Sequence, residues 1–242
     1  MISIRRGICP SVLADAPVDG IHYNKKAVVE ALHLMQNGKC CYCEAFIPDE
    51  GHGKAVEHFH PKSVYKHQKN DWINLLLACD HCNGSKSDLF PVRLSDIEGG
   101  VTVIYKPLTT DGSPLMIDPS EHGIDPEDHI TFVVDLRKEN AMHGLPVAKN
   151  GSQKGQATIE TVRLDASYLL RVRQQLLYTL SGMMIVLHEA KAVSDTDKIQ
   201  TYKALFESRM AHKSPYAGFV RAFSRHYGLD KQFQLRVPRG ID

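Results

Sequence analysis

Apolar residues recur at helical spacing in two parts of the chain. In the first, Val28, Leu32 and Met35 fall on one face of a segment that runs from about residue 24 to residue 37. In the second, similar apolar stripes run from about residue 166 to residue 228, and we expect them to pack into a core. The three helices of this second part are expected to begin after Asp165, Ser194 and Ser214.

Between these parts the pattern predicts short strands. Val56 and Phe59 indicate a strand that ends at Pro61, and the apolar run Leu75–Ala78 indicates a second strand. Residues from about 82 to 88 can form a short helix after it. The three elements together form a β–β–α unit. A hairpin turn is expected at His52.

These elements divide the chain into four regions of an α+β fold. An N-terminal extension with its helix covers residues 1–39, and the β–β–α core covers residues 40–91. Residues 92–160 are rich in Pro, Gly and Asp and are expected to form loops and short β segments. Residues 161–242 are mainly helical and are a possible docking region for a partner. Five arginines are expected on solvated helix faces: Arg163, Arg171, Arg173, Arg221 and Arg225.

Composition and charge narrow the classes of function. The 242 residues include 29 Lys and Arg against 28 Asp and Glu, so a nucleic acid must be met by a local basic patch. No apolar run is long enough for a transmembrane helix, and no signal peptide is visible. We therefore expect a cytoplasmic protein whose six cysteines are metal ligands or free thiols.

Two C-x-x-C pairs carry the strongest chemical signal in the chain. A tight turn with this spacing aims two thiolates at one ion, and two such turns complete a tetrahedral zinc site. The alternative is a redox pair of the thioredoxin type, which needs only one C-x-x-C. The expected ligands of structural zinc are Cys40, Cys43, Cys79 and Cys82.

Two more cysteines and one histidine stand outside this set. Cys41 and Cys43 have only one residue between them, which is a poor spacing for a zinc knuckle. Cys9 and Cys41 are therefore expected to be ordinary thiols. His81 lies between two of the ligands and could replace one of them.

The segment between the two pairs has the residue types of a phosphodiester hydrolase. Such an enzyme needs a hard cation, usually Mg²⁺, held by oxygen ligands, and a general base beside it. Glu57 offers a carboxylate, Asn83 offers an amide oxygen, and His58 can take a proton from the attacking water. Asn74 can tie the loop between the strands and hold His58 in one tautomer. Two side chains could contact phosphate or simply be polar loop residues: His60 and Lys62.

Four segments together resemble the HNH, or ββα-metal, endonuclease superfamily: CYCE, VEHFHPKS, WINLLL and ACDHCNGSKSD. Under this resemblance the motif residues H, N and H correspond to His58, Asn74 and Asn83, with asparagine in place of the last histidine. The acidic residue before the first histidine is a metal ligand in that superfamily, which implies this role for Glu57. The expected cofactors are structural Zn²⁺ and a catalytic Mg²⁺ or Mn²⁺.

A narrower resemblance covers most of the chain. The N-terminal Arg/Pro stretch, the helix leading into C-x-Y-C-E, and the segments Ile117–Phe132 and Gly155–Asp165 are similar to the PtuB family of HNH nucleases. These nucleases belong to Septu and retron-associated antiphage systems. The resemblance implies DNA, in particular phage DNA, as the substrate and an ABC-type ATPase, PtuA, as the partner. This chain has no GxxxxGK[ST] motif, so control by a nucleotide must come through the partner.

Two other functions stay open at this point. The chain could be a stand-alone HNH nuclease of the restriction or homing type. It could also be a zinc-stabilised adaptor that binds nucleic acid or protein without catalysis. In the adaptor, the placing of Glu57, His58 and Asn83 would be a coincidence.

Overall fold

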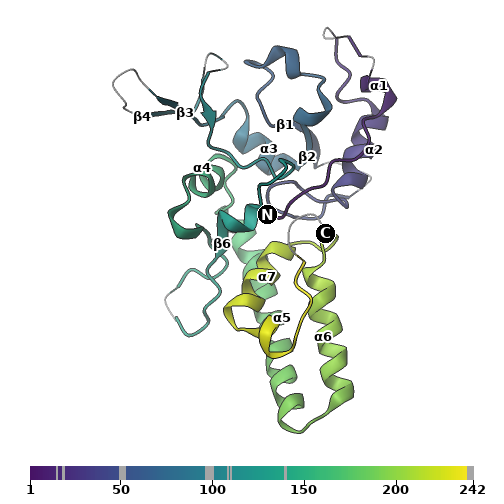
Figure 1. The fold of residues 1–242 in the computed structure, drawn as a ribbon, viewed down its shortest axis with the longest axis vertical. Helices are drawn as coiled ribbons and strands as arrows, with labels where there is room; N and C mark the ends of the chain where they lie inside the picture. The colour runs from purple at the N-terminus through teal and green to yellow at the C-terminus, as the bar shows by residue number, and fades with distance from the viewer. Residues whose placement is uncertain are drawn as a thin grey trace.

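The computed structural model confirms the α+β fold class, with small sheets, a C-terminal helical region and a cluster of four cysteines. Figure 1 shows the small sheets and the N-terminal region at one end of the molecule, and two long helices projecting as a hairpin at the other. His52, which we expect in a hairpin turn, lies outside the described residues. The structure describes residues 1–14, 16–17, 20–48, 53–95, 101–107, 109, 111–138 and 141–238.

The elements follow one another along the chain as helices and short strands. The helices are α1 (Ser11–Ala14), α2 (Lys26–Met35), α3 (Asp80–Lys86), α4 (Gln153–Thr161), α5 (Ser167–Ala192), α6 (Thr196–Met210), α7 (Ala217–His226) and α8 (Leu229–Gln232). The strands are β1 (Lys54–His58), β2 (Leu75–Cys79), β3 (Val92–Ser95), β4 (Val101–Ile104), β5 (Ser113–Pro114), β6 (Ile130–Phe132) and β7 (Pro146–Ala148). Short 3₁₀ turns are η1 (Lys66–Gln68), η2 (Trp72–Asn74), η3 (Pro126–Asp128) and η4 (Lys149–Gly151).

The β–β–α unit is built on the antiparallel pair of β1 and β2, with α3 directly after β2. The register places Lys54 opposite Cys79 and His58 opposite Leu75. All residues from Leu75 to Ala78 are buried, because β1, α2 and α3 pack around this strand. A strand covered in this way reads as a continuous apolar run rather than as an alternation of apolar and polar residues.

Gln36 ties α2 to the open edge of β2. Its side-chain oxygen accepts a hydrogen bond from the Leu77 amide at 2.7 Å, and its Nε2 donates to the Leu77 carbonyl at 2.8 Å. The same Nε2 donates to the Lys39 carbonyl at 2.8 Å. An amide side chain thus satisfies backbone groups that a neighbouring strand would otherwise bond. The chain therefore leaves α2 at a fixed position next to β2 and enters the first C-x-x-C turn.

The C-terminal region forms an antiparallel hairpin of α5 and α6, and α7 packs against both helices. The three predicted helices are present, but each begins later than predicted: α5 follows Ala166 rather than Asp165, and α7 follows Tyr216 rather than Ser214. α6 begins one residue later than a cap at Ser194 would place it. Asp195 is the cap, since its carboxylate accepts a hydrogen bond from the Lys198 amide at 3.0 Å. Within the described residues no helix is both long and apolar enough to cross a membrane.

Two of the five arginines expected on solvated faces are buried, so that prediction was wrong for them. Arg173 is 2% exposed and donates to the Leu164 carbonyl at 2.8 Å. Arg221 is 0% exposed, and its guanidinium lies 2.8 Å from the Glu127 carboxylate. Arg225 also pairs with this carboxylate. Glu127 lies in the loop-rich region, far along the chain from Arg221 and Arg225. Its ion pairs with these two arginines therefore join that region to the C-terminal helices.

We expect Glu127→Gln to destabilise the protein by about 3 kcal/mol, because the change leaves the Arg221 guanidinium buried without its counter-charge. The matched control is Glu30→Gln. The Glu30 carboxylate lies 3.7 Å from the ammonium of Lys26, four residues away on the same helix, and both side chains are solvent-exposed. That change should cost less than about 0.5 kcal/mol. Urea unfolding measures both values, and equal losses would contradict the prediction.

Candidate active site and metal centre

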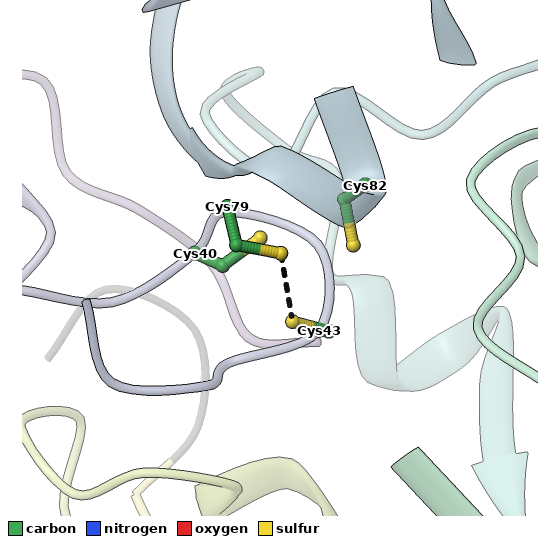
Figure 2. Close-up of side chains that lie close together, drawn as sticks. All are labelled: Cys40, Cys43, Cys79 and Cys82. Atoms are coloured by element: carbon green, nitrogen blue, oxygen red, sulfur yellow. Dashed lines mark hydrogen bonds between the residues drawn. The ribbon is translucent and has the colours of Figure 1, made fainter. Parts of the chain in front are cut away.

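Four cysteines converge from three different elements. Cys40 and Cys43 lie on the turn after α2, Cys79 ends β2, and Cys82 lies in the first turn of α3. Their sulfur atoms all lie within 4.8 Å of one another, and the sulfurs of Cys43 and Cys79 are 3.8 Å apart. Figure 2 shows the four side chains gathered around a common centre. Tetrahedral zinc with bonds of about 2.3 Å separates its sulfur ligands by about 3.8 Å, so this donor set fits zinc.

Cys9 and Cys41 lie outside the cluster, and the His81 ring points elsewhere. Burial raises the pKa of Cys41 well above its usual value, which keeps this thiol neutral. Burial opposes ionisation of Cys40 as well, but hydrogen bonds from neighbouring thiols hold the pKa of Cys40 well below its usual value. The His81 ring nitrogen lies 3.3 Å from the Arg163 carbonyl, and the ring packs against Tyr168.

A cleft of about 260 Å³ opens beside β1 and α3. Glu57 and His58 reach it from β1, and Asn83 reaches it from the second turn of α3. Adjacent residues on a flat strand point to opposite faces. Here Glu57 and His58, the last two residues of β1, both line one cleft. The exposed side chain of Lys62 also lines this cleft.

His58 is held as a neutral imidazole in one tautomer. It is 6% exposed, and its Nε2 lies 2.9 Å from the Lys69 carbonyl oxygen. A carbonyl only accepts, so Nε2 carries the proton and Nδ1 keeps a free lone pair. Burial lowers the pKa of His58 to about 4, and the nearby charges of Lys62 and Lys86 act in the same direction. At neutral pH the imidazole is therefore unprotonated, as a general base must be before it takes a proton.

Glu57 is buried against a lysine that the sequence reasoning missed. Its Oε1 lies 2.7 Å from the Lys86 ammonium and accepts a hydrogen bond from the Tyr42 hydroxyl at 3.3 Å. Burial raises the pKa of Glu57, while Lys86 and Tyr42 act against this rise. Within the described part of the chain, Oε2 makes no hydrogen bond or ion pair. The carboxylate thus keeps one oxygen for a cation.

Lys86 also donates to the His58 carbonyl at 2.8 Å, so one ammonium holds both residues at the end of β1. A sequence signal could have pointed to it. Lys86 follows Asn83 by three residues and therefore lies on the same face of a helix. The spacing of Asn83 and Lys86 alone does not reveal that the buried Glu57 carboxylate lies opposite this face.

Asn74 does only part of what we expected. Its Oδ1 accepts a hydrogen bond from the His60 amide at 2.7 Å, and its Nδ2 donates to the carbonyls of His60 at 3.0 Å and Gln68 at 3.2 Å. These bonds tie the loop between the strands, as expected. Among the hydrogen bonds of the described residues, none joins Asn74 to His58, and the carbonyl of Lys69 holds that ring instead. Any effect of Asn74 on His58 must pass through the loop.

The structure separates the two candidates for phosphate contact. Lys62 lies at the cleft, whereas His60 lines a different hollow together with Phe59 and Asn74. The His60 ring packs against the rings of Tyr65 and Phe90 at 4.8 and 5.0 Å. Of the two, only Lys62 is therefore placed to meet a substrate in the cleft.

Comparison with known proteins confirms the two resemblances seen in the sequence. Residues 40–89 match the HNH endonuclease family, so this part of the chain is an HNH endonuclease domain. The Septu protein PtuB of Bacillus thuringiensis is 43% identical over 64 residues, which are 26% of this chain and 25% of that protein. The Septu protein PtuB of Bacillus mycoides (strain KBAB4) is 29% identical over 197 residues, which are 76% of this chain and 59% of that protein. The chain thus covers less than two thirds of the length of either relative.

We expect Cys82→Ser to abolish zinc binding and to lower the melting temperature by about 10 °C or more, because binding energy at such a site is folding energy. Cys41→Ser is the matched control, since Cys41 is equally buried but lies outside the cluster. It should keep its zinc and lose only a few degrees. Elemental analysis and thermal unfolding measure both effects. Full zinc content in folded Cys82→Ser would show that this thiol is not a ligand.

Proposed function

We propose, from the HNH endonuclease domain at residues 40–89, that this protein is a metal-dependent endonuclease that hydrolyses phosphodiester bonds of DNA. The observation that supports it best is the cleft. It joins a neutral imidazole with a free Nδ1 to the oxygen donors of Glu57 and Asn83. A hydrolase of this kind needs both a base and a hard-cation site at one phosphorus atom.

In this proposal His58 is the general base. Its Nε2–H bond to Lys69 fixes the ring, and Nδ1 takes the proton of the water that attacks the phosphate. Glu57 and Asn83 hold a Mg²⁺ or Mn²⁺ ion through oxygen atoms, which are the donors that these cations prefer. When bound, the cation offsets negative charge on the phosphate and on the leaving 3′ oxygen.

Other residues in and around the cleft hold these groups in place. Lys86 compensates the charge of Glu57 and holds the end of β1, so it supports both the ligand and the base. Asn74 keeps the loop between the strands closed. Lys62 supplies a positive charge at the mouth of the cleft, where a DNA phosphate would pass. The four cysteines hold structural zinc and keep α3 in place.

We further propose that the protein is the effector nuclease of a Septu-type antiphage system in the cytoplasm, with phage DNA as the substrate and the ABC-type ATPase PtuA as the partner. The PtuB relatives support this assignment. The proposed docking region is the helical part, residues 161–242. Tyr178 and Ile185 are exposed large apolar residues seven positions apart on α5, and therefore on one face of the projecting hairpin. This region is tested by co-purification with the ATPase, in which the wild type is compared with a variant that has a charged residue in place of Tyr178.

We expect His58→Ala to lower the cleavage rate by about 10²- to 10⁴-fold, because the variant lacks the group that takes the proton. The control is His67→Ala, which removes an exposed histidine from the same loop and should cut like the wild type. Plasmid cleavage is measured with Mg²⁺, Mn²⁺ or EDTA, alone and with the ATPase. Leaving both Mg²⁺ and Mn²⁺ out of the buffer should stop cleavage without unfolding the protein.

Two results would overturn parts of this proposal. Wild-type cleavage rates in folded, zinc-loaded His58→Ala would exclude His58 as the base. Tight DNA or protein binding, without metal-dependent cleavage of any substrate by the wild type, would instead favour the zinc-stabilised adaptor.

A further inference from the structure

Tyr23 lies against two residues that line the catalytic cleft. Its ring meets the His58 ring edge-on, with 4.6 Å between the ring centroids. The Lys62 ammonium lies 4.9 Å from the centroid of the Tyr23 ring and donates a hydrogen bond to the Tyr23 hydroxyl at 3.2 Å. One side chain thus contacts both the general base and the cation at the cleft mouth. Tyr23 lies outside residues 40–89, the part that matches the HNH family.

The backbone around Tyr23 is fixed by Asn70. The Oδ1 atom of Asn70 accepts hydrogen bonds from the amides of His22 at 3.1 Å and Tyr23 at 3.2 Å. Its Nδ2 atom donates to the carbonyls of Pro17 at 3.3 Å and Gly20 at 3.4 Å. The residue before Asn70 carries the carbonyl that holds His58. One short stretch of the loop therefore fixes both the base and the segment that packs against it.

We infer that Tyr23 is a positioning residue of the catalytic cleft, which sets the plane of the His58 ring and holds Lys62 as a contact for the DNA phosphate. This inference rests on the proposed nuclease function. The His58 ring is hydrogen-bonded through Nε2 to one carbonyl, which leaves it free to swing about that bond unless a neighbouring side chain blocks the motion. The edge-on ring of Tyr23 supplies that block.

The hydroxyl of Tyr23 has a separate task. Lys62 is an exposed side chain with four rotatable bonds, and such a side chain loses conformational freedom when it binds an anion. The hydroxyl and the ring face of Tyr23 hold the ammonium near the cleft before DNA arrives, which reduces that loss. The ring therefore serves the rate of the chemical step, and the hydroxyl serves substrate binding.

Two substitutions separate these tasks. Tyr23→Phe keeps the ring and removes the hydroxyl, so kcat should stay within about two-fold while KM for DNA rises about three- to five-fold. Tyr23→Leu removes the ring, so kcat should fall at least ten-fold, because small misplacements of a catalytic group are costly. Lys62→Met should raise KM at unchanged kcat and lower the salt dependence of KM by about one phosphate contact. The matched control is Tyr105→Leu, an exposed tyrosine whose hydroxyl bonds Glu160 and not a residue of the cleft, and this change should alter neither constant.

Steady-state cleavage of a labelled duplex gives these constants, and NMR of histidine-labelled protein reports the ring contact independently of activity. The His58 signals, identified by their loss in His58→Ala, should shift in Tyr23→Leu and not in Tyr105→Leu. Wild-type kcat and KM in Tyr23→Leu would overturn the inference and leave the nuclease proposal standing. Unchanged His58 signals in Tyr23→Leu would overturn the ring contact itself. A wild-type protein that cuts no DNA, but whose His58 signals do respond to Tyr23→Leu, would overturn the proposed nuclease function and with it the positioning role, while the ring contact would stand.

Discussion

The cysteine cluster is the constraint on which the rest of the site depends. It joins the turn after α2, the end of β2 and the first turn of α3. Asn83 and Lys86 follow Cys82 on the same short helix. The position of Cys82 in the cluster therefore sets where the oxygen of Asn83 and the ammonium of Lys86 meet the end of β1.

The buried ion pair of Glu57 and Lys86 carries a desolvation cost that a cation site at Glu57 would explain. Both side chains are almost fully buried, and removing two charges from water costs more than a single contact at 2.7 Å is expected to return. A pair of apolar residues would stabilise the hairpin at least as well. Keeping the carboxylate makes sense if its second oxygen serves a cation in the cleft. The neighbouring His58 avoids a comparable cost because burial keeps it neutral.

Short-range spacing made much of this molecule predictable. The C-x-x-C pairs, the two strands and the position of Asn83 depend on residues a few positions apart, and the sequence contains that information directly. The buried arginines, the partner of Glu57 and the true support of His58 depend on contacts between distant segments. Arg221 and Glu127 are 94 residues apart, so no local pattern could place them together. Asn74 illustrates the limit of prediction from sequence. Its hydrogen bonds to the loop were predictable from its position, but the Lys69 carbonyl that holds the His58 ring was not.

The flanking regions of the chain pack directly against the cleft and the cysteine cluster. α2 covers β2 and is bonded to it through Gln36, and the segment just before α2 brings Tyr23 to His58. On the other side, His81 in the first turn of α3 packs against Tyr168 at the start of α5. The helix that carries Cys82, Asn83 and Lys86 is thus in contact with the base of the projecting hairpin. A change in how α5 sits would act on α3 directly, through packed side chains, and α3 carries both Cys82 of the cysteine cluster and Asn83 of the cleft.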